Sequence, residues 1–229
     1  QTSDTELREI LRAEAGSTEI KCDFEVSMTR EVAHEAASLP ARMSGDHRQS
    51  NIDGKENIIR REPSGVVTVI SPWNYPLDLS LRAVAPAIAT GNSVVLKPAT
   101  PTPISGGLAI ARLFEETDLP DGVLNVITGR GSVLGDHLAG HSAADVVAFT
   151  GSSGIGRRVA AKAAESMAFP ALELGGNSPH VVLEDAPIDQ AVDAGVYGTW
   201  LHQGQSCTTI NRHVVHRSIY DEYVDRLVR

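Results

Sequence analysis

Five short apolar runs alternate with helical segments through most of this chain, and the alternation strongly constrains its fold. The runs are VVTVI (66–70), SVVLK (93–97), VLNVI (123–127), DVVAF (145–149) and HVVLE (180–184). Continuous apolar runs of this length indicate strands buried on both faces of a sheet. The segments between them, such as SGGLAIARLFEET, have the spacing of amphipathic helices. The sequence therefore predicts an α/β fold, a Rossmann-like parallel sheet of βαβ units with flanking helices.

The segment before the first run has a helical pattern. Apolar residues recur there at i, i+4 spacing and predict one buried stripe: Phe24, Met28, Val32 and Ala36. We expect this helix to end at Leu39-Pro40. The polar stretch SGDHRQSNIDGKEN then predicts a linker, and IIRREPSGVVTVI predicts a hairpin or two short strands with a turn at residues 63–65.

Composition excludes several classes of protein. The net charge is −9 and the basic residues are scattered, which argues against a nucleic-acid-binding face. No apolar run is long enough for a membrane helix. Two distant cysteines, Cys22 and Cys207, make no disulfide framework and suit a reducing cytoplasm. We expect no metal site.

In open α/β sheets, ligands bind at the carboxyl ends of the strands. The residues that follow the runs form a polar, glycine-rich rim that suits a nucleotide: residues 71–76, 98–100, 128–131 and 150–156. GRGSVLG, with Gly129, Gly131 and Gly135, is similar to the dinucleotide fingerprint with one extra residue. FTGSSGIG, with Gly151 and Ser152, offers a helix N-terminus and hydroxyl groups to a phosphate. Taken alone, either loop could be an ordinary turn between strand and helix.

Two polar side chains stand out on this rim. Lys97 follows an apolar strand directly, so its amine could hold a ribose hydroxyl or a phosphate, or could simply be a solvated lysine at a strand end. Asn74 lies in SPWNYP, where prolines stiffen the loop. A rigid amide N–H donor suits an oxyanion hole, although Asn is also a common turn former.

Glu173 and Cys207 are candidates for catalysis. Glu173 lies in ALEL, where loss of solvation would raise its pKa toward that of a general base, unless it points to water from an edge strand. Cys207 follows a predicted helix that breaks at Gly204, so its thiol could face a cleft or be a buried structural thiol. For Cys22 we expect a buried structural role.

Taken together, six segments in order resemble the NAD(P)-dependent aldehyde dehydrogenase family: SPWNYP, GNSVVLKPA, GVLNVITG, FTGSSGIGR, LELGGNSP and GQSC. The resemblance runs from about residue 15 to the C-terminus. It implies that Cys207 is the nucleophile, that Glu173 is the general base, and that Asn74 forms an oxyanion hole with the backbone N–H of Cys207. It also implies contacts to the cofactor from Trp73, Lys97, Pro98, Thr100, Gly131, Gly151 and Ser152. The family does not use the fingerprint itself, so GRGSVLG becomes a turn on the adenine side.

The resemblance implies oxidation of an aldehyde to a carboxylic acid through a thiohemiacetal and a thioester on Cys207. WLHQGQSC has His202 where many members have Asn, which is similar to bacterial dehydrogenases of benzaldehyde, vanillin or salicylaldehyde. Thr100 stands where many NAD-preferring members have Glu. Without that charge, NADP is possible, although we expect NAD as the cofactor.

Family members are usually much longer, so we expect this chain to be C-terminally truncated. Residues 1–172 are expected to hold the N-terminal helices and the NAD(P)-binding domain, and residues 173–229 to begin a second α/β catalytic domain. A full-length parent is expected to be a homodimer or homotetramer. The alternatives are a fragment that binds NAD(P) without efficient turnover, a CoA-acylating dehydrogenase and a structural protein. Glu173 argues against a CoA-acylating dehydrogenase, and the intact set of Asn74, Glu173 and Cys207 argues against a structural protein.

Overall fold

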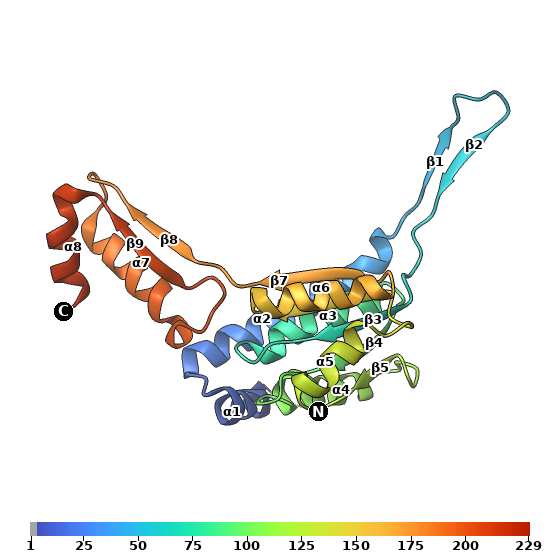
Figure 1. Cartoon of the computed structure of the whole chain (residues 1–229), viewed down its shortest axis with the longest axis horizontal. Helices are drawn as coiled ribbons and strands as arrows, with labels where there is room; N and C mark the ends of the chain where they lie inside the picture. The colour runs from blue at the N-terminus through green and yellow to red at the C-terminus, as the bar shows by residue number, and fades with distance from the viewer. Residues whose placement is uncertain (1–3) are drawn as a thin grey trace. The chain divides into compact units, whose positions relative to one another are not determined.

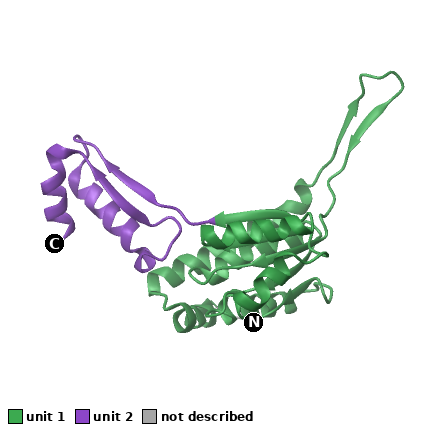
Figure 2. Cartoon of the chain, viewed as in Figure 1, with its two compact units in different colours: residues 1–173 green, residues 174–229 purple. Residues whose placement is uncertain are grey.

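A five-stranded sheet with the order β5-β4-β3-β6-β7 lies in the first of two units into which the chain divides, residues 1–173 and 174–229 (Figure 2). The computed structural model describes residues 4–229. The strands are β3 (Val66–Ile70), β4 (Ser93–Lys97), β5 (Leu124–Val126), β6 (Val146–Gly151) and β7 (Phe169–Leu174). β4 and β6 pair in parallel with β3, and β5 pairs in parallel with β4. Four of the five predicted apolar runs thus form one parallel sheet, as the sequence predicts.

Helices cover both faces of this sheet (Figure 1). They are α3 (Pro76–Ala89), the π-helical turn η1 (Ile104–Leu108) with α4 (Ala109–Glu115), α5 (Gly131–Ala139) and α6 (Ser153–Glu165). α3 and α4 contact β3, β4 and β5, whereas α5 and α6 contact β3, β6 and each other. The core between them is aliphatic, with Val69, Val94 and Leu96 almost fully buried. Val and Ile at strand positions fit a sheet packed on both sides.

The chain order around β3 defines where a ligand can bind. From β3 the chain continues to β4 and β5 on one side, and then crosses to β6 and β7 on the other. Such a reversal in a doubly wound sheet leaves a crevice outside the carboxyl ends of the two central strands. Here those ends lead into the loop after β3 and the turn after β6.

The N-terminal helices differ in detail from the prediction. They are α1 (Asp4–Ala15) and α2 (Glu19–Arg42), so α2 continues two residues beyond Pro40. The proline lies in the last turn, where the N–H of Met43 closes the helix on the Pro40 carbonyl. The predicted stripe is only partly right: Ala36 is buried and Val32 packs partly buried against the core, but Phe24 is 45% exposed. Cys22 and Val26, which are outside the stripe, are buried on this helix.

The predicted linker is in fact a hairpin. β1 (Asp46–Gln49) and β2 (Glu56–Ile59) pair antiparallel, so β2 does not form a hairpin with β3 (Figure 1). The polar composition that predicted a linker equally fits this two-stranded ribbon, because both of its strands are almost wholly exposed.

The second unit has its own small sheet. β8 (Ser178–Val182) and β9 (Ile210–Val215) pair in parallel, and α7 (Ile188–Trp200) and α8 (Tyr220–Leu227) complete the unit with the short 3₁₀ segments η2 (Leu201–Gly204) and η3 (Arg217–Ile219). Val182, Ala191, Val192 and Tyr223 form its core. The fifth apolar run, residues 180–184, therefore belongs to this unit rather than to the five-stranded sheet. Among the described residues, no helix has the length and apolar character needed to cross a membrane.

Candidate active site

The loop after β3 carries Trp73 and Asn74 at the carboxyl edge of the sheet. The loop begins at Ser71, whose N–H donates to the Lys97 carbonyl at 3.1 Å. The buried hydroxyls of Ser71 and Ser80 also bond each other at 2.7 Å. Trp73 is 44% exposed, whereas Asn74 is half-buried. The structure therefore places both predicted residues at the edge where ligands bind in this type of sheet.

Lys97 ends β4 but does not present its amine to solvent. The residue is 2% exposed, and Nζ donates to the Pro98 carbonyl at 2.8 Å. Burial lowers the pKa of the Lys97 ammonium, because loss of water disfavours its charged form. Of the two alternatives left open by the sequence, the solvated lysine at a strand end is therefore wrong, because the amine is buried against the Pro98 carbonyl.

Thr100 lies in the loop after β4, and Gly131 is the first residue of α5, directly after the loop that follows β5. The Thr100 hydroxyl donates to the Gly129 carbonyl at 3.3 Å, which joins the two loops. Gly129 has a φ of 154°, a conformation that strongly favours glycine. Gly131 begins α5, and a side chain there would meet nothing within 4 Å. Open space at this position leaves the backbone approachable by a ligand.

The turn from β6 into α6 has the features of an anion site. Gly151 must lack a side chain, because a Cβ would lie 2.6 Å from the Phe149 ring. Ser152 is exposed and precedes the helix without making a side-chain cap, and the first turn contains no acidic residue. A phosphate would therefore meet uncapped N–H groups and the positive end of the helix dipole. These residues fit a dinucleotide cofactor.

Of the two environments that the sequence leaves open for Glu173, the structure shows the exposed one on an edge strand. It lies in β7, an edge strand of the sheet, and its residue is exposed. Exposed and half-buried residues alternate along this strand. The prediction of a carboxylate desolvated by its leucine neighbours is therefore wrong here, because Leu172 and Leu174 occupy the alternate positions of the strand.

Cys207 is exposed in the second unit, and Cys22 is buried in the first. The helix before Cys207 ends at Trp200, earlier than the predicted break at Gly204. His202 and Gln203 take positive φ values of 50° and 55°, followed by Gly204 at 74°. Three consecutive left-handed residues are a costly conformation that helical continuation would not allow. They redirect the chain into the loop that presents the thiol.

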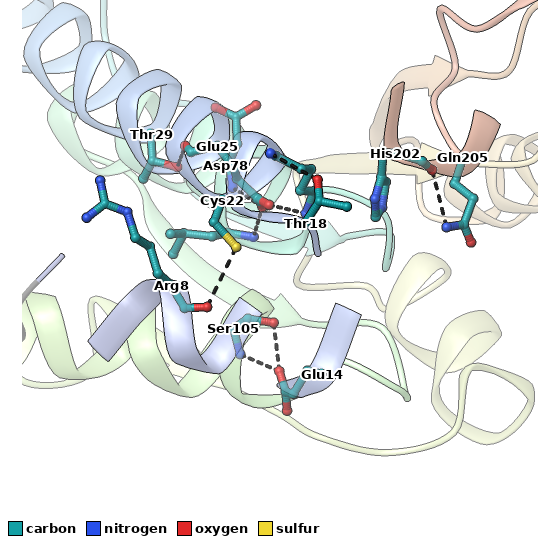
Figure 3. A network of polar contacts seen from close by, with 12 residues as sticks. Arg8, Glu14, Thr18, Cys22, Glu25, Thr29, Asp78, Ser105, His202 and Gln205 are labelled. Carbon is teal, nitrogen blue, oxygen red and sulfur yellow. Dashed lines mark hydrogen bonds and ion pairs between the residues drawn. The ribbon is translucent and has the colours of Figure 1, made fainter. Parts of the chain in front are cut away.

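Hydrogen bonds hold the loop around Cys207. The Ser206 N–H donates to the Thr209 hydroxyl at 3.1 Å, and the Thr209 N–H donates back to the Ser206 carbonyl at 3.2 Å. The Gln205 amide donates to the His202 carbonyl at 3.3 Å (Figure 3). Gly176 lies against the same loop, since a Cβ there would be 3.1 Å from the Cys207 carbonyl oxygen. Gly176, the last residue of LELGG, thus lies against the GQSC loop within the second unit.

Cys22 has the structural role that the sequence predicts. It is fully buried between α1 and α2, and its Sγ lies 3.7 Å from the Arg8 carbonyl (Figure 3). Burial is the main reason that the pKa of this thiol is raised, which makes it a poor nucleophile.

The sequence did not single out Gly176, Lys21 or Glu25. Lys21 and Glu25 form a fully buried ion pair in α2, close to the loop after β3. Two opposite charges four residues apart on a helix could have suggested a pair, but they do not predict its burial. In the part of the chain that the structure describes, no three His, Cys, Asp or Glu side chains are placed to hold a metal ion.

Comparison with known proteins gives consistent matches. The aldehyde dehydrogenase family matches residues 1–229. A vanillin dehydrogenase of Corynebacterium glutamicum is 48% identical over 97% of this chain and 46% of its own length. The benzaldehyde dehydrogenase YfmT of Bacillus subtilis is 45% identical over 94% of this chain and 44% of its own. The chain therefore spans about half the length of these relatives.

Solved structures give the same result. An NAD-dependent benzaldehyde dehydrogenase from Corynebacterium glutamicum superposes with a TM-score of 0.93 at 48% identity, over 98% of this chain and 50% of that one. A mutant betaine aldehyde dehydrogenase from Staphylococcus aureus in complex with NAD+ gives a TM-score of 0.95 at 36% identity, over 98% of this chain and 45% of that one.

Proposed function

Because the chain belongs to the aldehyde dehydrogenase family, we propose that it serves in the oxidation of an aromatic aldehyde to a carboxylic acid with NAD+. The observation that carries this proposal is the contrast between its two cysteines. Cys22 is buried, whereas Cys207 is exposed on a loop set by left-handed residues. An exposed thiol at this point of the chain suits a nucleophile better than a packing role.

The cofactor is proposed to lie along the carboxyl edge of the five-stranded sheet. Ser152 and Gly151 would hold its pyrophosphate at the start of α6, and Lys97 and Pro98 would contact the adenine ribose. Thr100, Gly131 and Trp73 complete the proposed contacts. When bound, the nicotinamide supplies the acceptor for hydride. Thr100 brings no negative charge against a 2′-phosphate, so NADP is a possible second cofactor.

The chemistry of the chain itself begins at Cys207. Its thiolate attacks the aldehyde carbon and forms a thiohemiacetal. The Asn74 side-chain amide and the Cys207 backbone N–H are proposed to stabilise the oxyanion, where loss of one donor typically costs about 3 kcal/mol of barrier. Departure of hydride from this carbon leaves a thioester on Cys207. Glu173 then takes a proton from the water that hydrolyses the thioester to the acid.

The substrate class rests on the named relatives. They are vanillin and benzaldehyde dehydrogenases, and both substrates carry an aldehyde on an aromatic ring. We propose an aromatic aldehyde for this chain, in an enzyme that acts in the cytoplasm as a homodimer or homotetramer. A reducing cytoplasm would keep the exposed Cys207 thiol free.

A second candidate function is cofactor binding without efficient turnover. The exposure of Glu173 favours it, because a hydrated carboxylate is a weaker general base than a desolvated one. Under this alternative the edge of the sheet still binds NAD+, but acyl transfer from Cys207 to water is slow.

The test is NADH formation by the purified chain with NAD+ and a panel of vanillin, benzaldehyde and aliphatic aldehydes. We expect absorbance of NADH with the aromatic aldehydes and none with Cys207→Ala. Binding of NADH with no more than about one equivalent of NADH formed per Cys207 would support the second candidate instead. Equal activity in Cys207→Ala would contradict the proposed nucleophile.

A further inference from the structure

A fully buried ion pair lies behind the loop that carries Asn74. Lys21 and Glu25 stand one turn apart on α2, and neither side chain has any exposed surface. The Lys21 ammonium bonds the Glu25 carboxylate and also lies 4.7 Å from the centre of the Tyr75 ring. Burying two charges is expensive, and well-packed apolar residues in their place are often as stable. The pair therefore calls for an explanation beyond general stability.

The Glu25 carboxylate caps the first turn of α3 (Figure 3). Its Oε1 atom accepts the N–H of Leu77 at 2.8 Å and the N–H of Asp78 at 3.3 Å, while Oε2 accepts from Lys21. These amides lie in the first turn of the helix, where no intrahelical partner exists. The preceding residue, Tyr75, supplies no side-chain cap. A carboxylate some fifty residues earlier in the sequence, on another helix, supplies it.

The cap fixes one end of a short loop whose other end is fixed by the sheet. Ser71 is bonded to the Lys97 carbonyl and to the Ser80 hydroxyl. Leu77, six residues later, is bonded to Glu25. Trp73 and Asn74 lie between these two anchors, so the direction in which they point depends on both.

The electrostatics of Glu25 agree with this arrangement. Burial raises the pKa of its carboxyl group, whereas the Lys21 charge and the two backbone N–H groups lower it. Burial has the larger effect, so the pKa of Glu25 is raised on balance, and the Lys21 charge reduces the cost of keeping the carboxylate buried.

We propose that Glu25, with Lys21 as its counter-ion, is a positioning residue that orients the loop carrying Trp73 and Asn74. The part played by the loop in catalysis rests on the proposed function. The anchoring of the loop by Glu25 does not. Because it acts through Leu77 and Asp78, Glu25 itself touches no substrate or cofactor.

Two double variants remove the charges of both Lys21 and Glu25 and differ only in whether residue 25 still offers an acceptor oxygen. Their comparison measures the effect of the helix cap apart from the effect of charge. Lys21→Met/Glu25→Gln keeps an acceptor oxygen for Leu77 and Asp78, and Lys21→Met/Glu25→Leu removes it at similar volume. Glu14→Leu is the matched control, because Glu14 bonds the N–H groups of Ile104 and Ser105 at a different helix start. All variants are made in the whole chain, in a Trp200→Phe background, so that Trp73 is its only tryptophan.

Amide hydrogen exchange at Leu77 and Asp78 tests whether Glu25 anchors the loop. We expect exchange about tenfold faster in the leucine variant and within about threefold of the parent in the glutamine variant, because one charged-group hydrogen bond is lost or replaced. Glu14→Leu should leave these two amides unchanged. Equal exchange in the glutamine and leucine variants would overturn the proposal. If the leucine variant does not fold, Glu25→Asp serves in its place, since it keeps the charge but shortens the reach, and unchanged exchange there would also overturn it.

Quenching of Trp73 fluorescence by NADH tests the consequence for the site. We expect the quenching amplitude to fall at least about twofold in the leucine variant and to be retained in the glutamine variant, because energy transfer depends on ring orientation and a small misplacement in a site has large effects. Quenching that is unchanged in the leucine variant, with NADH bound, would contradict control of Trp73 by Glu25. Absence of NADH binding in the parent would count against the proposed function, and the exchange result would still decide the anchoring.

Discussion

The carbonyl oxygen of Cys207 lies 3.1 Å from the position that a Cβ atom on Gly176 would occupy. That distance is shorter than ordinary van der Waals contact, so the loop of the proposed nucleophile packs directly on a bare backbone. A Cβ atom on Gly175, the preceding residue, would meet no heavy atom within 4 Å. Of the two adjacent glycines, Gly176 is the one required by the fold around Cys207.

Substitution of these glycines should have unequal effects. Gly176→Ala should lower the free energy of unfolding of the second unit by about 1 kcal/mol, because the Cys207 backbone must shift to admit the methyl group. It should also slow acylation of Cys207 by roughly tenfold, since displacement of a reacting group is costly. Gly175→Ala is the control and should do neither. Denaturant unfolding and the rate of acyl transfer to Cys207 measure both effects, and equal behaviour of the two variants would refute the packing argument.

The two cysteines should differ in reactivity toward a soluble alkylating reagent. Cys207 is exposed, and Cys22 is fully buried with a thiol whose pKa is raised by burial. Iodoacetamide should therefore label Cys207 alone in the native chain, and both residues after unfolding in denaturant. Mass spectrometry of the digested protein reads the two sites separately. Labelling of Cys22 in the native chain at a comparable rate would contradict its assigned burial.

Replacement of Lys97 should change the free energy of unfolding and the affinity for NADH in opposite directions. Lys97→Met removes a buried ammonium with a lowered pKa and keeps most of the side-chain volume, so the free energy of unfolding should rise. Affinity for NADH should fall by about tenfold, the usual effect of losing one hydrogen bond from a charged group. Thermal unfolding and NADH titration give the two values. A variant that binds NADH as tightly as the parent would remove Lys97 from the cofactor site.

The second unit should lose stability in mild acid through His213. Its ring bonds the Tyr223 hydroxyl at 2.7 Å and the Thr199 hydroxyl at 3.0 Å. Burial, and then the neighbouring charge of His180, lowers the pKa of His213. The unfolded state therefore takes up the proton first, and the free energy of unfolding should fall as the pH drops below about 6.5 and through the lowered folded pKa.

His213→Gln tests this origin because it keeps polar contacts without a titrating ring. Urea unfolding between about pH 5 and 8 should show a shallower dependence on pH in this variant than in the parent. His47→Gln, at an exposed position of the β1–β2 hairpin, serves as control and should retain the slope of the parent. An unchanged slope in His213→Gln would assign the acid sensitivity to other groups.

Much of the fold follows from local pattern, but long-range pairing does not. The sequence predicts β3, β4 and β6 because they are covered on both faces and their runs are apolar. It also predicts β5, although this strand lies at the sheet edge and its Asn125 is exposed. β7 was not among the predicted runs, since its residues alternate between exposed and half-buried positions at a sheet edge. The sequence predicts a linker over β1 and the start of β2, because polar strands that pair only with each other have no apolar pattern to detect.

In the candidate site, too, local sequence features could be predicted and long-range contacts could not. Residue chemistry and position along the strands single out Asn74, Lys97, Ser152, Glu173 and Cys207 as candidates. Their individual roles come from the resemblance to a known family and stay predictions. Sequence reasoning left two environments open for Lys97 and for Glu173, because their burial depends on neighbours that a strand pattern does not specify. The structure shows Lys97 buried and Glu173 exposed. Glu25 was missed entirely, because its contact with Leu77 joins two helices across about fifty residues of intervening chain.

The measurement that tests the central claim most directly is detection of an acyl group on Cys207. The chain is mixed with NAD+ and vanillin, quenched rapidly in acid and digested. The mass of the Cys207 peptide is measured by mass spectrometry, and NADH is quantified from the same sample. The account predicts that, within the first turnover, the peptide carries the acyl group of vanillin as a thioester and that NADH forms in matching amount. Neither should be seen with Cys207→Ala. NADH bound by the chain, with no acyl group on Cys207 at any time after mixing, would contradict it.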